Sequence, residues 1–141
     1  MRILLADDHP LFLDALRSML ESHGLEVIGT ARDGVEAIEQ ARILHPDVIL
    51  MDIQMPNLDW LATLRLLKAE MPGAKILMLT MSADDEDLFE AVKCGASGYL
   101  LKTRDSREFF DLLADAEKGD AVLSTGLASR ILAEFRRRDS A

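Results

Sequence analysis

Several residue types that define whole protein classes are scarce in this sequence. Cys94 is the only cysteine, which excludes an internal disulfide, and we interpret it as a small buried hydrophobe in a reducing cytosol. No apolar run approaches the roughly 20 residues that a membrane-spanning helix needs. Asp7 and Asp8 interrupt the first apolar run too early for a signal peptide. We therefore expect a soluble, cytoplasmic protein without a membrane partner.

Positive charge is also in short supply, because 16 Lys and Arg residues face 25 Asp and Glu residues and leave a net charge of −9. Such a chain repels a polyanion, so we expect it not to bind nucleic acid by itself. The basic triplet at residues 136–138 lacks interleaved aromatic residues, and we interpret it as the solvated end of a helix. Apolar residues, in contrast, make up 49% of the 141 residues, enough for one folded domain with its own core.

Short apolar runs alternate along the chain with stretches in which apolar residues recur at helical spacing. The runs predict five strands, at residues 2–6, 25–31, 48–51, 76–81 and 99–101. A helix is predicted after each of them, and an additional amphipathic helix at 126–138 follows a connector at 120–125. This (βα)5 pattern predicts an α/β fold, a doubly wound parallel sheet of flavodoxin-like strand order 2-1-3-4-5.

Three carboxylates fall on neighbouring strand ends in that order. Asp7 and Asp8 follow the first predicted strand and Asp52 follows the third, so we expect them to meet at the carboxyl edge of the sheet. Their mutual repulsion would be relieved by a divalent cation, and hard oxygen ligands favour Mg²⁺, or Mn²⁺ in its place. His9 adjoins the acids but precedes Pro10, and we interpret it as a local loop residue rather than a metal ligand.

Two further strand ends reach the same edge, with Thr80 on the fourth strand and Lys102 on the fifth. A hydroxyl and a fixed ammonium opposite a cation form a clamp for a tetrahedral dianion. A carboxylate inside such a clamp, here Asp52, acts as a nucleophile and forms an aspartyl-phosphate. Each residue alone has an ordinary structural explanation, but their shared edge favours phosphoryl transfer.

Four separated motifs in the sequence match the pattern of a known family. They are the pair Asp7-Asp8, the sequence MDIQMP around Asp52, LT at residues 79–80 and GASGYLLK at residues 95–102. In this order they closely resemble the receiver domain of bacterial two-component response regulators, over residues 1–119. The resemblance implies a phosphorelay protein that accepts a phosphoryl group from a sensor histidine kinase and forms a homodimer on phosphorylation. It implies no enzyme activity beyond the chain's own phosphorylation and dephosphorylation.

The same resemblance implies a role for each candidate residue. Asp52 would be the phosphoacceptor, and Thr80 and Lys102 would bind the oxygens of its phosphoryl group. Tyr99 would be the aromatic residue that turns inward when Thr80 moves. Mg²⁺, or Mn²⁺, would be held by four residues: Asp7, Asp8, Asp52 and Gln54, the last through its backbone carbonyl.

Finer features resemble one subfamily. The sequences DDHPLF and GYLLK, with a connector beginning near Gly119, look like the LuxR/NarL-type regulators. The resemblance implies a receiver domain at 1–119, and a linker and helix at 120–141 that lead to an output domain missing from this sequence. DNA would be bound only through that domain, in a protein that regulates transcription. A natural stand-alone receiver is the alternative.

Three positions depart from the family pattern. Trp60 stands where the family usually has Gly, and Ala62 where it commonly has an acidic residue. We therefore expect a rearranged loop after Asp52, with an exposed indole that packs against a partner. Thr103 stands where many relatives have Pro after a cis peptide bond. Because a non-proline cis bond costs roughly 2.5–4 kcal/mol, we expect a different backbone at Lys102.

Two other functions stay open. A hydrolase of haloacid-dehalogenase type, which forms an aspartyl-phosphate, usually carries a second Asp two residues after the nucleophile, and Gln54 stands there instead. A pseudo-receiver would be a protein-binding module that never turns over phosphate. The complete set of acids argues against it, and the altered Trp60 position favours it.

Overall fold

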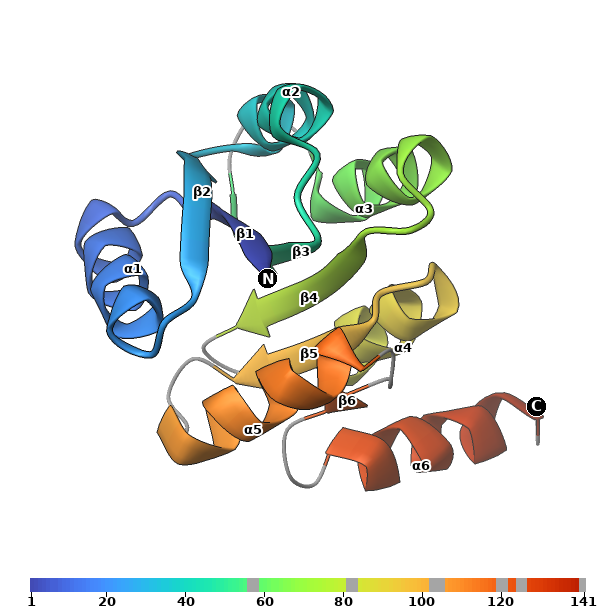
Figure 1. The fold of residues 1–141 in the computed structure, drawn as a ribbon. Coiled ribbons are helices and arrows are strands. Elements are labelled where there is room, and N and C mark those ends of the chain that lie inside the picture. Colours follow the sequence, from blue (N-terminus) through green and yellow to red (C-terminus); the bar gives the residue numbers. More distant parts are fainter. Residues whose placement is uncertain (56–58, 81–83, 102–105, 119–121, 124–126, 140–141) are drawn as a thin grey trace.

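The computed structural model describes residues 1–55, 59–80, 84–101, 106–118, 122–123 and 127–139, and Figure 1 shows one sheet with helices on both sides. The strands are β1 Arg2–Ala6, β2 Glu26–Ala31, β3 Val48–Asp52, β4 Lys75–Thr80, β5 Gly98–Leu101 and β6 Val122–Leu123. The helices are α1 Pro10–Ser22, α2 Gly34–Leu44, α3 Trp60–Glu70, α4 Asp85–Lys93, α5 Ser106–Glu117 and α6 Leu127–Asp139.

All neighbouring strands are parallel, and their order is β2-β1-β3-β4-β5-β6. The predicted order 2-1-3-4-5 is therefore confirmed, with one addition at the edge. Val122 pairs with Gly98 and Leu123 with Tyr99, within a segment that we predicted to be only a connector. Without β6, the edge of β5 would leave its backbone groups unpaired, and a two-residue segment is enough to pair with them. An apolar run of two residues is too short to predict a strand from the sequence.

Two cores lie on opposite faces of the sheet because side chains alternate along each strand. Ile49 and Met51 of β3 pack into the core beneath α2, α3, α4 and α6, and Val48 and Leu50 into the core beneath α1 and α5. All four residues are essentially inaccessible to solvent. With both faces covered, the central strand β3 is apolar up to its last residue, Asp52, and the candidate carboxylates lie at or beyond strand ends.

Several of the acidic residues near these ends serve as helix caps. Asp33 accepts a hydrogen bond from the backbone N–H of Glu36 at 2.8 Å, at the start of α2. At the start of α4, Asp84 accepts hydrogen bonds from the backbone N–H groups of Glu86 at 2.9 Å and Asp87 at 3.1 Å. Such caps satisfy the exposed N–H groups of a first helical turn. These carboxylates therefore have structural roles, and the site is built from other acids.

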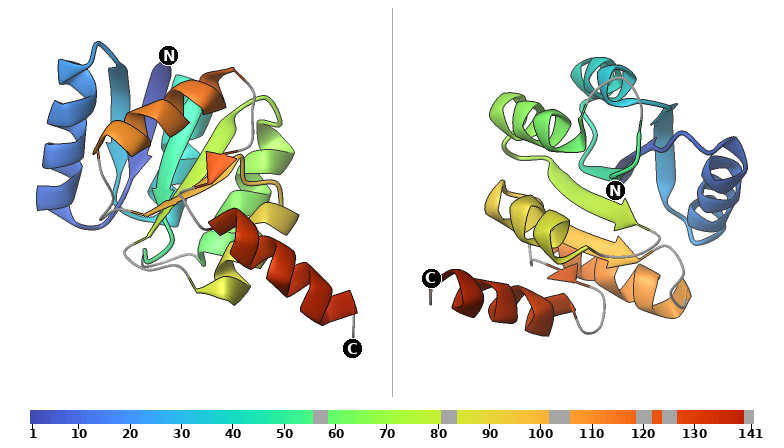
Figure 2. Two further views of the ribbon diagram at one scale, coloured as in Figure 1. Left: turned by 90° about the horizontal axis from the view of Figure 1, so that it is seen from below. Right: turned by 180° about the vertical axis from the view of Figure 1, so that it is seen from behind.

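Helix α6 lies beside α4, as the right-hand view in Figure 2 shows. Its apolar side buries Leu127 and Ile131, which belong to the same core as the strands. Phe135 meets Phe89 of α4 edge to face at a centroid distance of 4.7 Å, and the Arg138 guanidinium lies 4.0 Å from the Phe89 ring centre. The helix predicted at 126–138 is thus present and packed. Among the helices that the structure describes, none is long and apolar enough to cross a membrane.

Candidate functional site

The three predicted carboxylates meet at the carboxyl edge of the sheet. Asp7 follows the last residue of β1, and Asp52 is the last residue of the neighbouring strand β3. One side-chain ligand atom from each of Asp7, Asp8, His9 and Asp52 lies within 4.8 Å of the others. Asp7 is only 1% exposed and Asp52 only 2%. Two buried carboxylates this close together repel strongly, so the cluster favours a positive partner.

Hydrogen bonds hold part of this cluster in place. Asp7 Oδ1 accepts a bond from the backbone N–H of His9 at 2.9 Å. Asp52 Oδ1 accepts one from the backbone N–H of Gln54 at 3.2 Å. Asp8 Oδ1 is buried and accepts no hydrogen bond of standard geometry within the described residues. A buried carboxylate oxygen with no standard hydrogen bond fits a site that receives a cation, and the carboxylate oxygens of the three acids suit Mg²⁺.

The ring of His9 belongs to the same cluster. Its Nδ1 atom lies 2.9 Å from Asp7 Oδ1, 3.1 Å from Asp8 Oδ1 and 3.9 Å from Asp52 Oδ2, while 60% of its side chain is exposed. The sequence favours a loop role for His9 because Pro10 follows it. Pro10 does begin α1, and His9 is the extended residue that precedes this helix, with its imidazole beside the acids. Sequence spacing alone gives no sign of that contact.

Thr80 and Tyr99 lie on the two strands that extend this edge. Asp52 aligns with Leu79 of β4, so Thr80 is one residue further toward the carboxyl edge. Thr80 is 2% exposed. Lys102, which follows β5, lies outside the described residues. The structure therefore brings together Asp7, Asp8 and Asp52, puts Thr80 on the same edge, and leaves the predicted position of Lys102 untested.

Tyr99 is completely buried, with 0% exposure. Burial raises the pKa of its hydroxyl above the usual range, and the acids Asp87 and Asp84 raise that pKa further. Its oxygen makes no hydrogen bond of standard geometry within the described residues, although the Thr80 hydroxyl is close enough to oppose the rise in pKa. Tyr99 shares its core with Leu127 and Ile131 of α6. Sequence patterning does not indicate that this last helix shares the core of the aromatic residue.

The departures from the family pattern have mixed outcomes. Trp60 is the first residue of α3, after the cap residue Asp59, and no left-handed backbone is present there. Its indole is half-buried against the core rather than exposed, because the first helical turn directs it toward the sheet. Residues 56–58 of the preceding loop, and Thr103, lie outside the described residues. The expected rearrangement at these positions stays a prediction.

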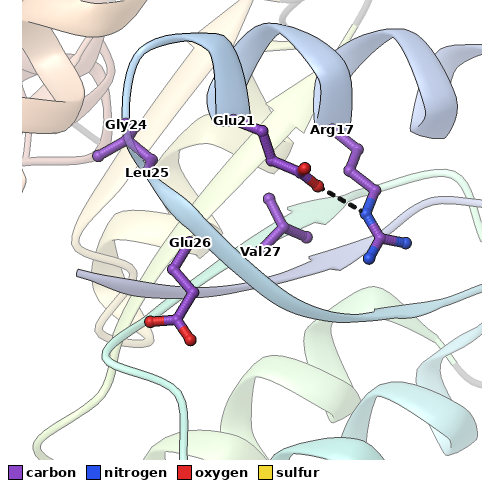
Figure 3. Close-up of a pocket in the computed structure, with 6 residues that line it drawn as sticks. All are labelled: Arg17, Glu21, Gly24, Leu25, Glu26 and Val27. Carbon is purple, nitrogen blue, oxygen red and sulfur yellow. Dashed lines mark hydrogen bonds and ion pairs between the residues drawn. The ribbon is translucent and has the colours of Figure 1, made fainter.

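A surface pocket of about 470 Å³ lies elsewhere, between α1 and β2 (Figure 3). Glu26 and Val27, which help line it, begin β2, so the pocket lies toward the amino edge of the sheet. Arg17 and Glu21 form an ion pair across its rim at 2.9 Å. It contains none of the predicted site residues, and we assign it no role in their chemistry.

The comparisons with known proteins agree with this geometry. A family profile described as "Response regulator receiver domain" matches residues 3–114. The transcriptional regulatory protein LiaR of Bacillus subtilis is 38% identical over 136 residues, covering 96% of this chain and 64% of LiaR.

Two solved structures extend the comparison. A two-component response regulator of the LuxR family from Aurantimonas sp. SI85-9A1 superimposes with a TM-score of 0.88 at 30% identity, over 95% of this chain and 96% of that one. The isolated receiver (REC) domain of RcsB from Salmonella enterica serovar Typhimurium, solved in the presence of the phosphomimetic BeF₃⁻, has a TM-score of 0.84 at 25% identity, covering 93% and 98%.

The parallel sheet with its acidic carboxyl edge, together with these matches, defines a signalling receiver domain: the chain belongs to the response regulator receiver family. Its similarity extends to the LuxR/NarL-type regulators, which confirms the subfamily resemblance in the sequence. The chain spans 64% of the length of LiaR.

Proposed function

We propose that this chain is a phosphorylation-activated receiver in which Asp52 accepts a phosphoryl group from the phosphohistidine of a sensor histidine kinase. The observation that supports this most strongly is the buried Asp52 carboxylate at the end of β3, clustered with Asp7 and Asp8. Burying several like charges costs stability unless a partner compensates them. A fold that keeps them together at a strand edge has the features of a reactive site.

In the transfer, a carboxylate oxygen of Asp52 attacks phosphorus while the phosphorus–nitrogen bond of the donor breaks. The donor imidazole keeps the electron pair of that bond and takes up a proton from water, and Asp52 becomes an acyl phosphate. The bond from the Gln54 N–H to Oδ1 fixes the carboxylate plane, and we assign the attack to Oδ2. Beyond this reaction and the hydrolysis of its product, we propose no catalysis.

Asp7, Asp8 and Asp52, with the backbone carbonyl of Gln54, would hold Mg²⁺, or Mn²⁺ in its place. A divalent ion bound there neutralises the charge of the transferred group. The buried Asp8 Oδ1, which accepts no standard hydrogen bond within the described residues, supports this assignment.

Thr80 and Lys102 would contact the phosphoryl oxygens, through a hydroxyl and an ammonium. Thr80 is buried at the same edge as Asp52, and the place of Lys102 rests on its position after β5. Tyr99, whose ring is already buried near Thr80, would be held in this inward position more strongly after phosphorylation. The phosphoryl group then acts as a switch because it favours one of two existing arrangements.

The output of the switch would be dimerisation and transcription regulation. LiaR is named as a transcriptional regulatory protein, and this chain covers 64% of it. We propose that a protein containing this receiver forms a homodimer on phosphorylation and contacts DNA through a separate C-terminal domain. The net charge of −9 makes DNA binding by the receiver itself unfavourable.

Intact-mass measurement after incubation with acetyl phosphate tests the proposal. With Mg²⁺ we expect one phosphoryl adduct per chain, and with EDTA in place of Mg²⁺ we expect none. A chain that gains no adduct in Mg²⁺, while a receiver known to react with acetyl phosphate does so alongside, would behave as a pseudo-receiver and contradict the proposal.

A further inference from the structure

The imidazole of His9 is the one group in the carboxylate cluster that has no role in the proposed phosphoryl transfer. Its Nδ1 atom lies 2.9 Å from Asp7 Oδ1 and 3.1 Å from Asp8 Oδ1. The side chain keeps these contacts although 60% of it is exposed. The neighbouring backbone N–H of His9 bonds Asp7 Oδ1 at 2.9 Å, which fixes the start of the side chain beside the acids.

An imidazole nitrogen changes which ions a carboxylate site prefers. Mg²⁺ binds oxygen ligands and water and gains little from nitrogen. Ni²⁺ and the other later first-row ions gain substantially, since imidazole suits them and their affinities rise along the series. The ligand atoms of Asp7, Asp8, His9 and Asp52 are within 4.8 Å of one another, a spread that one ion can bridge.

We propose that His9 is a nitrogen ligand of the cation site, so that the site binds a transition ion such as Ni²⁺ more tightly than its carboxylates would alone. This inference rests on the metal site of the proposed function. His9 would add an imidazole nitrogen to the carboxylate oxygens of the site. Transition ions would then compete with Mg²⁺ for the same site. His9 would reach the ion through Nδ1, the ring atom that already faces Asp7, Asp8 and Asp52.

The other two histidines of the chain supply controls, because neither belongs to the acidic cluster. His45 is exposed at the end of α2 with φ of 50°, a left-handed conformation that Asn tolerates well. His23 hydrogen-bonds through Nδ1 to the backbone carbonyl of Met19 at 2.9 Å and stacks on Phe110. His45→Asn is therefore a matched control for His9→Asn.

Isothermal titration calorimetry of the full chain with NiCl₂ and, separately, MgCl₂ tests the inference. Loss of an outer-shell partner alone typically costs 10–100-fold in metal affinity, so we expect His9→Asn to weaken Ni²⁺ binding by at least about tenfold. Mg²⁺ affinity should change by less than about threefold in the same variant, and His45→Asn should match the wild type for both ions.

Each other outcome overturns a different statement. If His9→Asn and His45→Asn lose Ni²⁺ affinity equally, or neither loses any, the nitrogen-ligand assignment is wrong. If the wild-type chain binds no Mg²⁺ at all, the metal site of the proposed function fails, whatever Ni²⁺ does. A circular-dichroism melt of each variant separates loss of a ligand from loss of the fold.

Discussion

At the scale of single residues, the carboxyl edge of the sheet concentrates negative charge where burial makes it costly. Asp7 and Asp52 are almost fully buried, and the partly exposed Asp8 adds a third charge beside them. Two unit charges about 4 Å apart interact by about 1 to 4 kcal/mol between the dielectric limits of water and a protein surface. The site is thus strained by repulsion before any cation binds.

Asp8→Asn should have opposite effects on stability without and with Mg²⁺. In EDTA the variant should unfold at a higher temperature than the wild type, because one repelling charge is gone. In saturating Mg²⁺ the order should reverse, since a ligand bound at 100 times its Kd adds about 2.7 kcal/mol to the native state of the wild type. Thermal melts of both proteins in EDTA and in Mg²⁺ measure this.

Asp14→Asn, which removes an exposed charge on α1, should melt like the wild type in both solutions. An Asp8→Asn protein that gains as much from Mg²⁺ as the wild type would contradict the assignment of Asp8 as a ligand.

At the scale of elements, the helix that departs most from the sequence-based picture is α6. The sequence predicts a helix over these residues but does not predict its docking against α4. Leu127 and Ile131 are buried, and Leu132 is 56% exposed, so one side of the helix faces the core. An apolar stripe in the sequence predicts that one face of a helix is buried. It does not predict which element that face packs against.

Ile131→Ala should therefore destabilise the protein, while Leu132→Ala should not. Truncating a buried Ile to Ala costs about 2–5 kcal/mol, and truncation of an exposed side chain usually changes stability by less than about 0.5 kcal/mol. Urea unfolding of both variants gives the two free energies. Hydrogen exchange of the Ile131→Ala protein should also show faster exchange in α4 and α6. Equal effects of the two substitutions would mean that α6 is not docked as described.

The charge on α6 makes its contribution to stability dependent on pH. Glu134 accepts hydrogen bonds from Arg137 and Arg138, and these bonds lower its pKa to about 2. Because the pKa is lower in the folded chain than in the unfolded one, the stabilisation is present above the usual pKa of Glu. It is lost as the pH falls through the range between that value and about 2.

Glu134→Gln removes this titration. We expect the difference in melting temperature between wild type and Glu134→Gln to be constant above about pH 6 and to shrink steadily below the ordinary Glu pKa of about 4.3. Melts at intervals between pH 3 and pH 7 measure it. A difference that does not change over this interval would show that the contacts with Arg137 and Arg138 do not hold Glu134 ionised.

Several features of the elements could be predicted because they depend on local chemistry. The five long strands and the start of α1 at Pro10 follow from apolar runs and from proline's place in a first helical turn. Three features could not be predicted. Strand β6 is only two residues long, the position of the His9 ring depends on the backbone where the chain enters α1, and the place of α6 depends on its docking against α4. The first and third are set by contacts between distant segments, and the second by local backbone conformation.

At the scale of the whole molecule, strand order accounts for the candidate site. Strands β1 and β3 are neighbours although a strand and two helices separate them in sequence. Their carboxyl ends therefore bring Asp7 and Asp52 together, and β4 adds Thr80 beside them. This arrangement could be predicted because right-handed crossovers leave few orders for such a chain. The position of Lys102 was predicted by the same reasoning and lies outside the described residues.

The most direct test of the central claim is the location of the phosphoryl group. Wild type, Asp52→Asn and the surface variant Asp14→Asn are incubated in parallel with acetyl phosphate and Mg²⁺, and their intact masses are measured. We predict one phosphoryl adduct on the wild type and on Asp14→Asn and none on Asp52→Asn, because Asp52 is the carboxylate of the buried acidic cluster to which we assign the nucleophilic attack. An adduct on Asp52→Asn at the wild-type level would contradict the assignment of Asp52 as the phosphoacceptor.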